Sequence, residues 1–319
     1  MKKTKALVAS LLAFLLTPAL LSSCFLAKKE LVMATGGASG TYYPLGTAIA
    51  GIWNEGMGDV DVKVLTTGAS VENIRLLDKG EVQAAIVQND VLDYAWNGTD
   101  LFEGGKIEGI QAIGTLYPEV VQVAASTESG ITDVRGLRGK RVSVGDSGSG
   151  VELNAKQILE GYGLSFGDIE MRNLSFKESA DAIRGGMLDA CFVTAGVPNA
   201  ALQELASSSG IVLVPVSGAE AKAVCTGYPF YTKTVIPGGT YRGTDADVQA
   251  LSVKATLVVS GSLSEDTVYR MTKALFEHLG ELGEAHPKGR DLSAPSAISG
   301  VTIYFHPGAI KYYRECGAM

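Results

Sequence analysis

The sequence predicts an α/β fold of two similar lobes, each an open and mostly parallel sheet with flanking helices, with a central ligand cleft between them. One unit of strand, glycine loop and helix occurs twice, in residues 31–53 and again in residues 141–159. Each copy is followed by a helix and a second apolar strand, which is the order of elements in an open α/β sheet. Ligands of such sheets bind beyond the carboxyl ends of the strands, and both glycine loops lie there.

The first unit begins with a short apolar strand at residues 31–35. A glycine loop follows, and Pro44 then opens a helix whose apolar residues keep helical spacing as far as Trp53. A helix around residues 73–77 leads to a strand at residues 83–87. That strand ends in three polar residues, Gln88, Asn89 and Asp90.

The second unit repeats this order. A strand at residues 141–144 runs into a loop with three glycines, and Ser149 with Glu152 forms the sequence pattern of a capping box at the start of the next helix. The counterpart of the inner strand, residues 189–193, ends in Thr194-Ala195-Gly196.

The two lobes are expected to be linked near residues 115–118 and again near residues 232–238. The chain then returns to the first lobe with a strand at residues 255–259 and a helix that begins around Ser264. We therefore expect lobe 1 to contain residues 31–115 and 236–319, and lobe 2 to contain residues 116–235.

The N-terminus has the pattern of a secretory signal. Three lysines precede a short apolar stretch, and Leu21-Ser22-Ser23-Cys24 resembles the lipobox of bacterial lipoproteins. Residues 1–23 are thus expected to be a lipoprotein signal peptide, Cys24 the lipidated residue, and residues 24–30 a tether that holds the protein outside the cytoplasm. The alternatives are an uncleaved signal anchor and an ordinary signal with an incidental cysteine.

The net charge and the cysteines reduce the number of possible functions further. The net charge of −7 becomes −10 when residues 1–23 are removed, because they contain three lysines and no acid. An acidic chain argues against nucleic acid and against adhesion to anionic lipid. Three cysteines remain besides Cys24, and they allow either a disulfide between Cys191 and Cys225 or buried free thiols.

No catalytic, cofactor or metal site is predicted. The three histidines lack the spacing of metal ligands, and the glycine loops do not match a dinucleotide-binding fingerprint. Ser147 stands on a strand-to-helix turn, but no histidine in its sequence context would supply a base, so it is a helix cap or a ligand hydroxyl rather than a nucleophile.

The residues instead predict the binding of a small anion. A helix N-terminus offers unpaired N–H groups and about half a positive charge, so it can hold a carboxylate without Arg or Lys. Two such ends would face one cleft, and their glycines would let a ligand oxygen reach the amides. The candidate ligand-binding residues are Gly37, Ser39, Gly40, Thr41, Tyr42, Tyr43, Gln88, Asn89, Asp90, Tyr117, Glu119, Ser147, Gly148, Ser149, Gly150, Thr194, Ala195 and Gly196.

Several of these residues have a second interpretation. One of Tyr42 and Tyr43 is expected in the cleft and the other in lobe packing. The polar residues 88–90 bind an amine or hydroxyl, or they cap the next helix. Glu119 pairs with a ligand ammonium group or is a surface charge.

An opening segment and six further segments in the same order resemble the TAXI family, the extracytoplasmic solute receptors of tripartite ATP-independent periplasmic (TRAP) transporters. The segments are Thr35–Gly46, Leu116–Glu119, Gly145–Gly150, Phe192–Gly196, Tyr228–Tyr231 with Ile236–Tyr241, and His306–Ile310. The resemblance implies a type II periplasmic-binding-protein fold and a sodium-coupled permease as partner. It also implies a small carboxylate as ligand, such as glutamate, glutamine or 2-oxoglutarate. The alternative function is the substrate-binding lipoprotein of an ABC-type importer.

Overall fold

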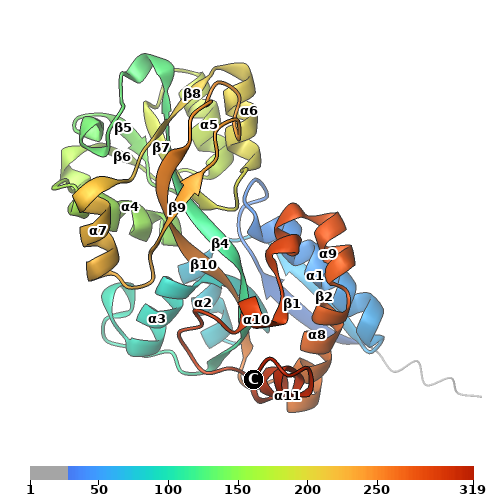
Figure 1. The fold of residues 1–319 in the computed structure, drawn as a ribbon. Coiled ribbons are helices and arrows are strands. Elements are labelled where there is room, and N and C mark those ends of the chain that lie inside the picture. The colour runs from blue at the N-terminus through green and yellow to red at the C-terminus, as the bar shows by residue number, and fades with distance from the viewer. Residues whose placement is uncertain (1–27) are drawn as a thin grey trace, which may run out of the picture.

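Two lobes joined by two long strands make up the computed structural model, which describes residues 28–319 (Figure 1). The predicted signal peptide and Cys24 lie outside the described residues. No helix within residues 28–319 is both long and apolar enough to span a bilayer.

Ten strands form one continuous sheet. They are β1 (Lys29–Ala34), β2 (Val60–Leu65), β3 (Ala84–Gln88), β4 (Ile110–Ser126), β5 (Arg141–Ser143), β6 (Glu170–Arg172), β7 (Ala190–Ala195), β8 (Ile211–Val214), β9 (Thr232–Ile236) and β10 (Val248–Ser260). Their order is β2-β1-β3-β10-β4-β7-β5-β6, with β8 paired to β4 and β9 paired to β10.

Eleven α-helices cover the faces of this sheet in the described part of the chain. They are α1 (Tyr42–Met57), α2 (Ser70–Asp78), α3 (Asn89–Asn97), α4 (Gly150–Gly161), α5 (Phe176–Arg184), α6 (Ala200–Ser208), α7 (Gly218–Gly227), α8 (Glu265–Glu277), α9 (Leu279–Ala285), α10 (Ala294–Ala297) and α11 (Pro307–Glu315). Short 3₁₀ turns include η5 (Pro287–Asp291).

Each lobe has the predicted parallel strands. In lobe 1, β1 pairs in parallel with β2 and β3, and in lobe 2, β5 pairs in parallel with β6 and β7. The strands β4 and β10 are antiparallel to each other and to their neighbours β3, β7, β8 and β9. Both strands are long, so one half of each lies in lobe 1 and the other half lies in lobe 2.

The first predicted link between the lobes, residues 115–118, lies inside β4 and is strand rather than loop. The second differs from the expectation. Residues 232–236 form β9, which pairs with the first residues of β10, and Ile236 and Tyr241 are buried in a core cluster of lobe 2. The chain returns to lobe 1 within β10, near Ala255, where pairing with β3 begins. Residues 236 to about 254 therefore belong with lobe 2 rather than with lobe 1.

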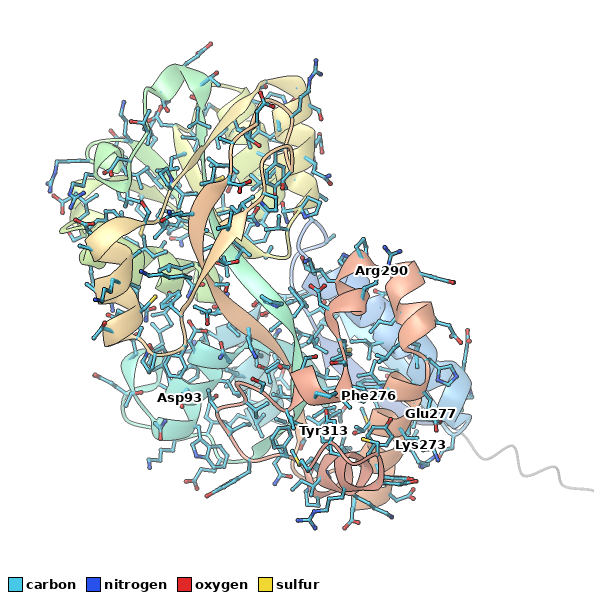
Figure 2. The ribbon with its side chains drawn as sticks, viewed as in Figure 1. Asp93, Lys273, Phe276, Glu277, Arg290 and Tyr313 are labelled. Atoms are coloured by element: carbon cyan, nitrogen blue, oxygen red, sulfur yellow. The ribbon has the colours of Figure 1, made fainter. Side chains whose placement is uncertain are left out.

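Successive side chains along each strand point to opposite faces of the sheet, so each lobe has a hydrophobic core on both faces. In β1, Leu31 and Met33 join one lobe-1 cluster, while Ala34 joins the cluster on the opposite face. The first of these clusters is covered by α1, α8 and α11, where Phe276 and Tyr313 meet edge to face with ring centroids 5.5 Å apart (Figure 2). In lobe 2, Phe192 and Val193 of β7 likewise face opposite clusters.

The cysteines within the described residues are free thiols. Cys191 is fully buried in β7, Cys225 is partly buried and Cys316 is exposed. Of the two possibilities that the sequence leaves open, the structure has the unpaired thiols.

Candidate functional site

A small cavity of about 50 Å³ lies between the lobes, at the carboxyl ends of the parallel strands. Ten of the predicted binding residues line it, namely Gly37, Ser39, Gly40, Thr41, Tyr42, Gln88, Glu119, Ser149, Gly150 and Thr194. Both glycine loops therefore reach one cavity, as the repeat predicts. The walls are in contact around it, so the structure has its lobes closed.

Four helices begin at this cavity. The first residues of α1, α2, α4 and α5, or the residues just before them, belong to its lining: Tyr42, Ser70, Gly150 and Phe176. The first N–H groups of a helix have no partner within the helix, and the helix dipole places partial positive charge there. Among the described residues that line the cavity, none is Lys, Arg or His. Any positive charge that this lining offers an anion therefore comes from backbone N–H groups.

Two amides of the glycine loops have hydrogen-bond partners within the protein. The N–H of Gly40 donates to Gly37 O at 2.9 Å, and the N–H of Gly148 donates to Glu152 Oε2 at 2.7 Å. The N–H groups of Tyr42 and Gly150 begin α1 and α4, where the first N–H groups have no partner within the helix.

The α4 start also differs in detail from a reciprocal capping box. Ser149 Oγ accepts from the N–H of Glu152 at 3.2 Å, as predicted. The Glu152 carboxylate, however, accepts from Gly148 N instead of from Ser149 N. The N–H of Ser149 instead donates to Asp146 O at 3.0 Å, within a turn.

Glu119 is one of two acids in the lining, with Asp146. It is buried in β4, where Tyr42 Oη donates to Oε2 at 2.7 Å and Tyr117 Oη donates to Oε1 at 3.2 Å. Burial raises the pKa of Glu119 to about 8, and the nearby Asp90 carboxylate adds to this. The side chain is therefore mostly uncharged at neutral pH, so it does not repel an anion.

Two side chains present acceptors to the cavity. Gln88 Oε1 is buried and has no hydrogen-bond partner among the described residues. Thr194 Oγ1 donates its proton to Asn154 Oδ1 at 2.9 Å, which leaves its lone pairs for a donor on the ligand. The site thus offers N–H donors from helix starts and acceptors from Gln88 and Thr194.

Hydrogen bonds cross from lobe to lobe beside the cavity. The N–H of Gly196 donates to Thr41 Oγ1 at 3.0 Å, and Asn199 Nδ2 donates to Ser39 O at 3.0 Å. Lys288 of η5 lies against Gly196, because a Cβ added at this glycine would stand 2.9 Å from the Lys288 Cγ. Each of these contacts joins a residue of lobe 1 to a residue of lobe 2.

The other predicted residues lie outside the lining. Tyr117 is behind Glu119, and Asn89 binds the backbone of Lys254 and Gly300. Asp90 is buried and accepts from Asn154 of the other lobe at 3.0 Å. The remaining ones are half-buried Tyr43, exposed Ser147, half-buried Gly148, and Ala195 and Gly196, which end β7 at the lobe contact.

Sequence reasoning missed two parts of the wall. One is the turn before α2 with Ala69 and Ser70, and the other is the start of α5 with Ser175 and Phe176. The second carries a recognisable signal, because Ser175 and Glu178 form a reciprocal capping box. Gly36, Asp146 and Val151 complete the set of unpredicted lining residues.

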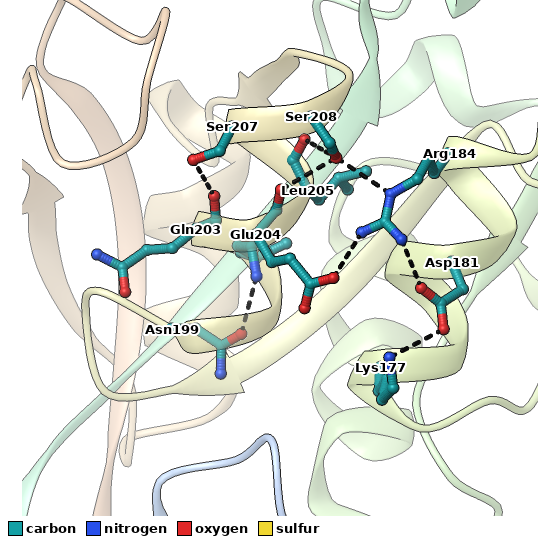
Figure 3. A network of polar contacts seen from close by, with 10 residues as sticks. Lys177, Asp181, Arg184, Asn199, Gln203, Glu204, Leu205, Ser207 and Ser208 are labelled. Carbon is teal, nitrogen blue, oxygen red and sulfur yellow. Dashed lines mark hydrogen bonds and ion pairs between the residues drawn. The ribbon is translucent and has the colours of Figure 1, made fainter.

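Polar groups elsewhere have structural roles. The imidazoles of His278 and His306 bind backbone groups, and within residues 28–319 no three His, Cys, Asp or Glu side chains gather as metal ligands. On the surface of lobe 2, Arg184 of α5 pairs with Asp181 of the same helix at 2.9 Å and with Glu204 of α6 at 3.1 Å (Figure 3). This arginine is therefore not part of the cavity.

A protein-family model matches almost the whole described chain, residues 33–317. It is the model of the NMT1-like family. This chain belongs to the NMT1-like family.

Solved structures of periplasmic binding proteins share this NMT1-like chain's fold. A periplasmic transporter protein is 13% identical with a TM-score of 0.56, and the match covers 91% of this chain and 93% of that one. The binding-protein component of an ABC phosphonate transporter from Pseudomonas aeruginosa is 11% identical with a TM-score of 0.53, over 82% of this chain and 79% of that one. The alkanesulfonate-binding protein SsuA from Xanthomonas axonopodis pv. citri, bound to MOPS, is 14% identical with a TM-score of 0.50, over 92% and 81%. The predicted two-lobed type II periplasmic-binding-protein fold is confirmed.

Proposed function

We propose that this protein is an extracytoplasmic solute-binding protein that captures a small carboxylate and delivers it to a membrane transporter. The observation that carries the proposal is the meeting of four helix N-termini at one interlobe cavity whose lining contains no cationic side chain. Such N-termini bind carboxylate oxygens through backbone N–H groups. Family membership and fold support a binding role rather than an enzymatic one.

The acceptors in the cavity favour a ligand that also has a hydrogen-bond donor. Gln88 Oε1 is buried without a partner, and an unpaired buried acceptor costs free energy until a donor reaches it. A carboxylate with an amino or hydroxyl group would satisfy both the helix N-termini and this oxygen. Among the expected ligands, glutamate and glutamine have such a group, while 2-oxoglutarate lacks it.

The type of transporter is a separate part of the proposal. Two of the structural neighbours are named as binding proteins for phosphonate and alkanesulfonate, the first for an ABC transporter. This likeness of fold supports an ABC-type importer, the alternative in the sequence analysis, more than the TRAP permease. The six ordered TAXI-like segments are the support for a TRAP permease. Purification of the protein with its membrane partner distinguishes the two, since an ABC importer contains an ATPase and a TRAP permease does not.

The proposed location rests on the N-terminal sequence and on the fold. The basic and apolar start followed by Leu21-Ser22-Ser23-Cys24 supports export and lipidation at Cys24. Replacement of Cys24 by Ser should release the protein from the membrane fraction. A Cys24→Ser protein that stays bound to membranes like the wild type would rule out this anchor.

A thermal-denaturation screen tests the ligand class. We expect the melting temperature to rise with at least one of L-glutamate, L-glutamine, 2-oxoglutarate or succinate. We expect no rise with NAD or with zinc. A ligand at 100 times its Kd adds about 2.7 kcal/mol to the free energy of unfolding if it binds only the native state. Methanesulfonate and methylphosphonate are the comparison anions. Unchanged melting with all four carboxylates, or a clear shift with zinc or NAD, contradicts the proposal.

A further inference from the structure

Asn154 of α4 stands one helical turn beyond the cavity and is fully buried. Its Oδ1 accepts from the hydroxyl of Thr194, a cavity residue, at 2.9 Å. Its Nδ2 donates to Asp90 Oδ2 of lobe 1 at 3.0 Å and to Tyr231 Oη at 2.8 Å. A single side chain therefore joins the cavity wall, the body of lobe 2 and the opposite lobe.

Chemistry fixes the orientation of this amide. A carboxylate accepts hydrogen bonds and cannot donate when ionised, so the Nδ2 group has to face Asp90 and the Oδ1 atom has to face Thr194. Asparagine is thus suited to this position in a way that aspartate is not. With aspartate, two buried carboxylates would face each other across the lobe contact.

The contact with Asp90 depends on closure. Asp90 is the second residue of α3 in lobe 1, whereas Thr194 and Tyr231 belong to lobe 2 with Asn154. Leu153, the neighbour of Asn154, is buried in a lobe-1 core cluster, which places this turn of α4 firmly against the other lobe. Separation of the lobes would break the Asn154–Asp90 hydrogen bond but leave the bonds to Thr194 and Tyr231.

We propose that Asn154 is a positioning residue for lobe closure, which holds the cleft shut through Asp90 and connects this contact to the ligand through Thr194. The connection to the ligand rests on the proposed function, because Thr194 contacts solute only if the cavity is the binding site. The closure contact itself involves residues of this chain alone.

A disulfide between the lobes can report closure. A Cβ built at Gly68 of lobe 1 lies 3.9 Å from the Cβ of Asp146 in lobe 2, within the range of disulfide-bonded cysteines. The parent protein is the full chain with Gly68→Cys and Asp146→Cys, in which Cys24, Cys225 and Cys316 are replaced by serine. The rate of disulfide formation under mild oxidation then measures how often the cleft is closed.

The Asn154→Asp variant of this parent should form the disulfide at least about tenfold more slowly at pH 8 without any ligand, because two carboxylates meet at the closed contact and one of them has to take up a proton before the cleft closes. Adding Asp90→Asn to it exchanges donor and acceptor and should restore the rate to within about threefold of the parent. Asn97→Asp is the matched control, since Asn97 is exposed on α3 and binds only Asp93. Its rate should equal that of the parent.

An Asn154→Asp variant that crosslinks at the parent rate overturns the proposal, and so does a double variant that stays as slow as the single one. Circular dichroism verifies folding. If Asn154→Asp does not fold, Asn154→Ala supplies the same comparison, and an unchanged rate there likewise overturns the proposal. A wild-type melting temperature that does not respond to L-glutamate, L-glutamine or 2-oxoglutarate counts against the proposed function and leaves the ligand-free comparison intact.

Discussion

Glu119 explains how an acidic chain can bind an anion next to a buried acid. The carboxyl is removed from water and surrounded by two tyrosine hydroxyls, and its charged form is disfavoured by burial more than it is favoured by these donors. With a pKa of about 8, the group is mostly protonated at pH 7 and has a proton to donate. Below this pKa, Glu119 can contribute a hydrogen bond to a bound carboxylate. Above it, the two negative charges repel each other.

We therefore predict that affinity for a carboxylate falls as the pH rises through 8. The folded-state pKa is raised above the ordinary value of a glutamic acid, so the neutral form is favoured in the closed protein, and this contribution is lost above about pH 8. The Kd should rise by up to about tenfold per pH unit above that point. Calorimetric titration from pH 7 to 9.5 measures it, with 2-oxoglutarate or succinate as ligand because both are almost fully ionised throughout that range.

The control for this prediction is Glu119→Gln, which keeps the shape of the side chain and removes its titration. Its Kd should stay nearly constant over the same range. Affinity that increases above pH 8 in the wild type would contradict the role of Glu119. If the Kd of Glu119→Gln still depends on pH, the pH dependence comes from another group.

Gly150 gives a second prediction at this scale, because Gln88 of the other lobe packs directly against it at the cavity. A Cβ there would lie 2.8 Å from Gln88 Nε2 and closer still to Oε1. We expect Gly150→Ala to displace the Gln88 amide or to hold the lobes apart, and to weaken solute binding at least tenfold. Gly51→Ala is the control. Its added methyl group meets no atom within 4 Å, and as a helix-interior substitution it should stabilise the protein by about 0.5–1 kcal/mol without affecting binding.

At the scale of elements, sequence patterns identify the repeated units better than the whole cavity wall. The strand at residues 31–35, the helix opened near Pro44 and the helix capped by Ser149 correspond to β1, α1 and α4. Their signals are local, since apolar periodicity and capping side chains lie within a few residues of each other. The start of α2 has a weaker signal, because its preceding residue, Ala69, adopts a positive φ of 73° where a glycine would be expected.

The helix pair α5 and α6 supports a prediction that separates charge on the surface from charge at the site. Arg184 of α5 pairs with Asp181 of its own helix and bridges to Glu204 of α6, and its side chain is about one-third exposed (Figure 3). Exposed ion pairs contribute little to stability, so Arg184→Gln should cost less than about 1 kcal/mol of unfolding free energy and leave the Kd for solute unchanged. Urea denaturation and calorimetry measure the two effects. A large loss of affinity would mean that the anion is held by a cation and not by helix N-termini.

At the scale of the whole molecule, β4 and β10 determine how the lobes move. Both strands pass from one lobe to the other, and their pairing has a register shift between Ala255 and Thr256, at the lobe boundary. Such an irregularity bends a strand.

The sequence locates the first crossover near residue 115 but not the second, because exposed β9 resembles a link until its pairing with β10 is known. Contacts across the cleft, such as Asp90 with Asn154, depend on how the lobes close and have no local sequence pattern.

Closure predicts a localised change in amide hydrogen exchange when solute binds. The N–H of Gly196 is in lobe 2, but its acceptor is Thr41 Oγ1 in lobe 1 at 3.0 Å, so opening of the cleft exposes this N–H to water. A ligand that favours the closed state should slow exchange at Gly196 about tenfold or more. The amides of Val216 and Ala112 are internal controls, because each donates within its own lobe, to Gln249 O and Tyr304 O, both at 2.9 Å. Their exchange should change much less. Equal protection at all three amides would indicate that the ligand stabilises the fold as a whole without closing the cleft, and an unprotected Gly196 in the presence of saturating ligand would mean that the closed arrangement is not the one that binds solute.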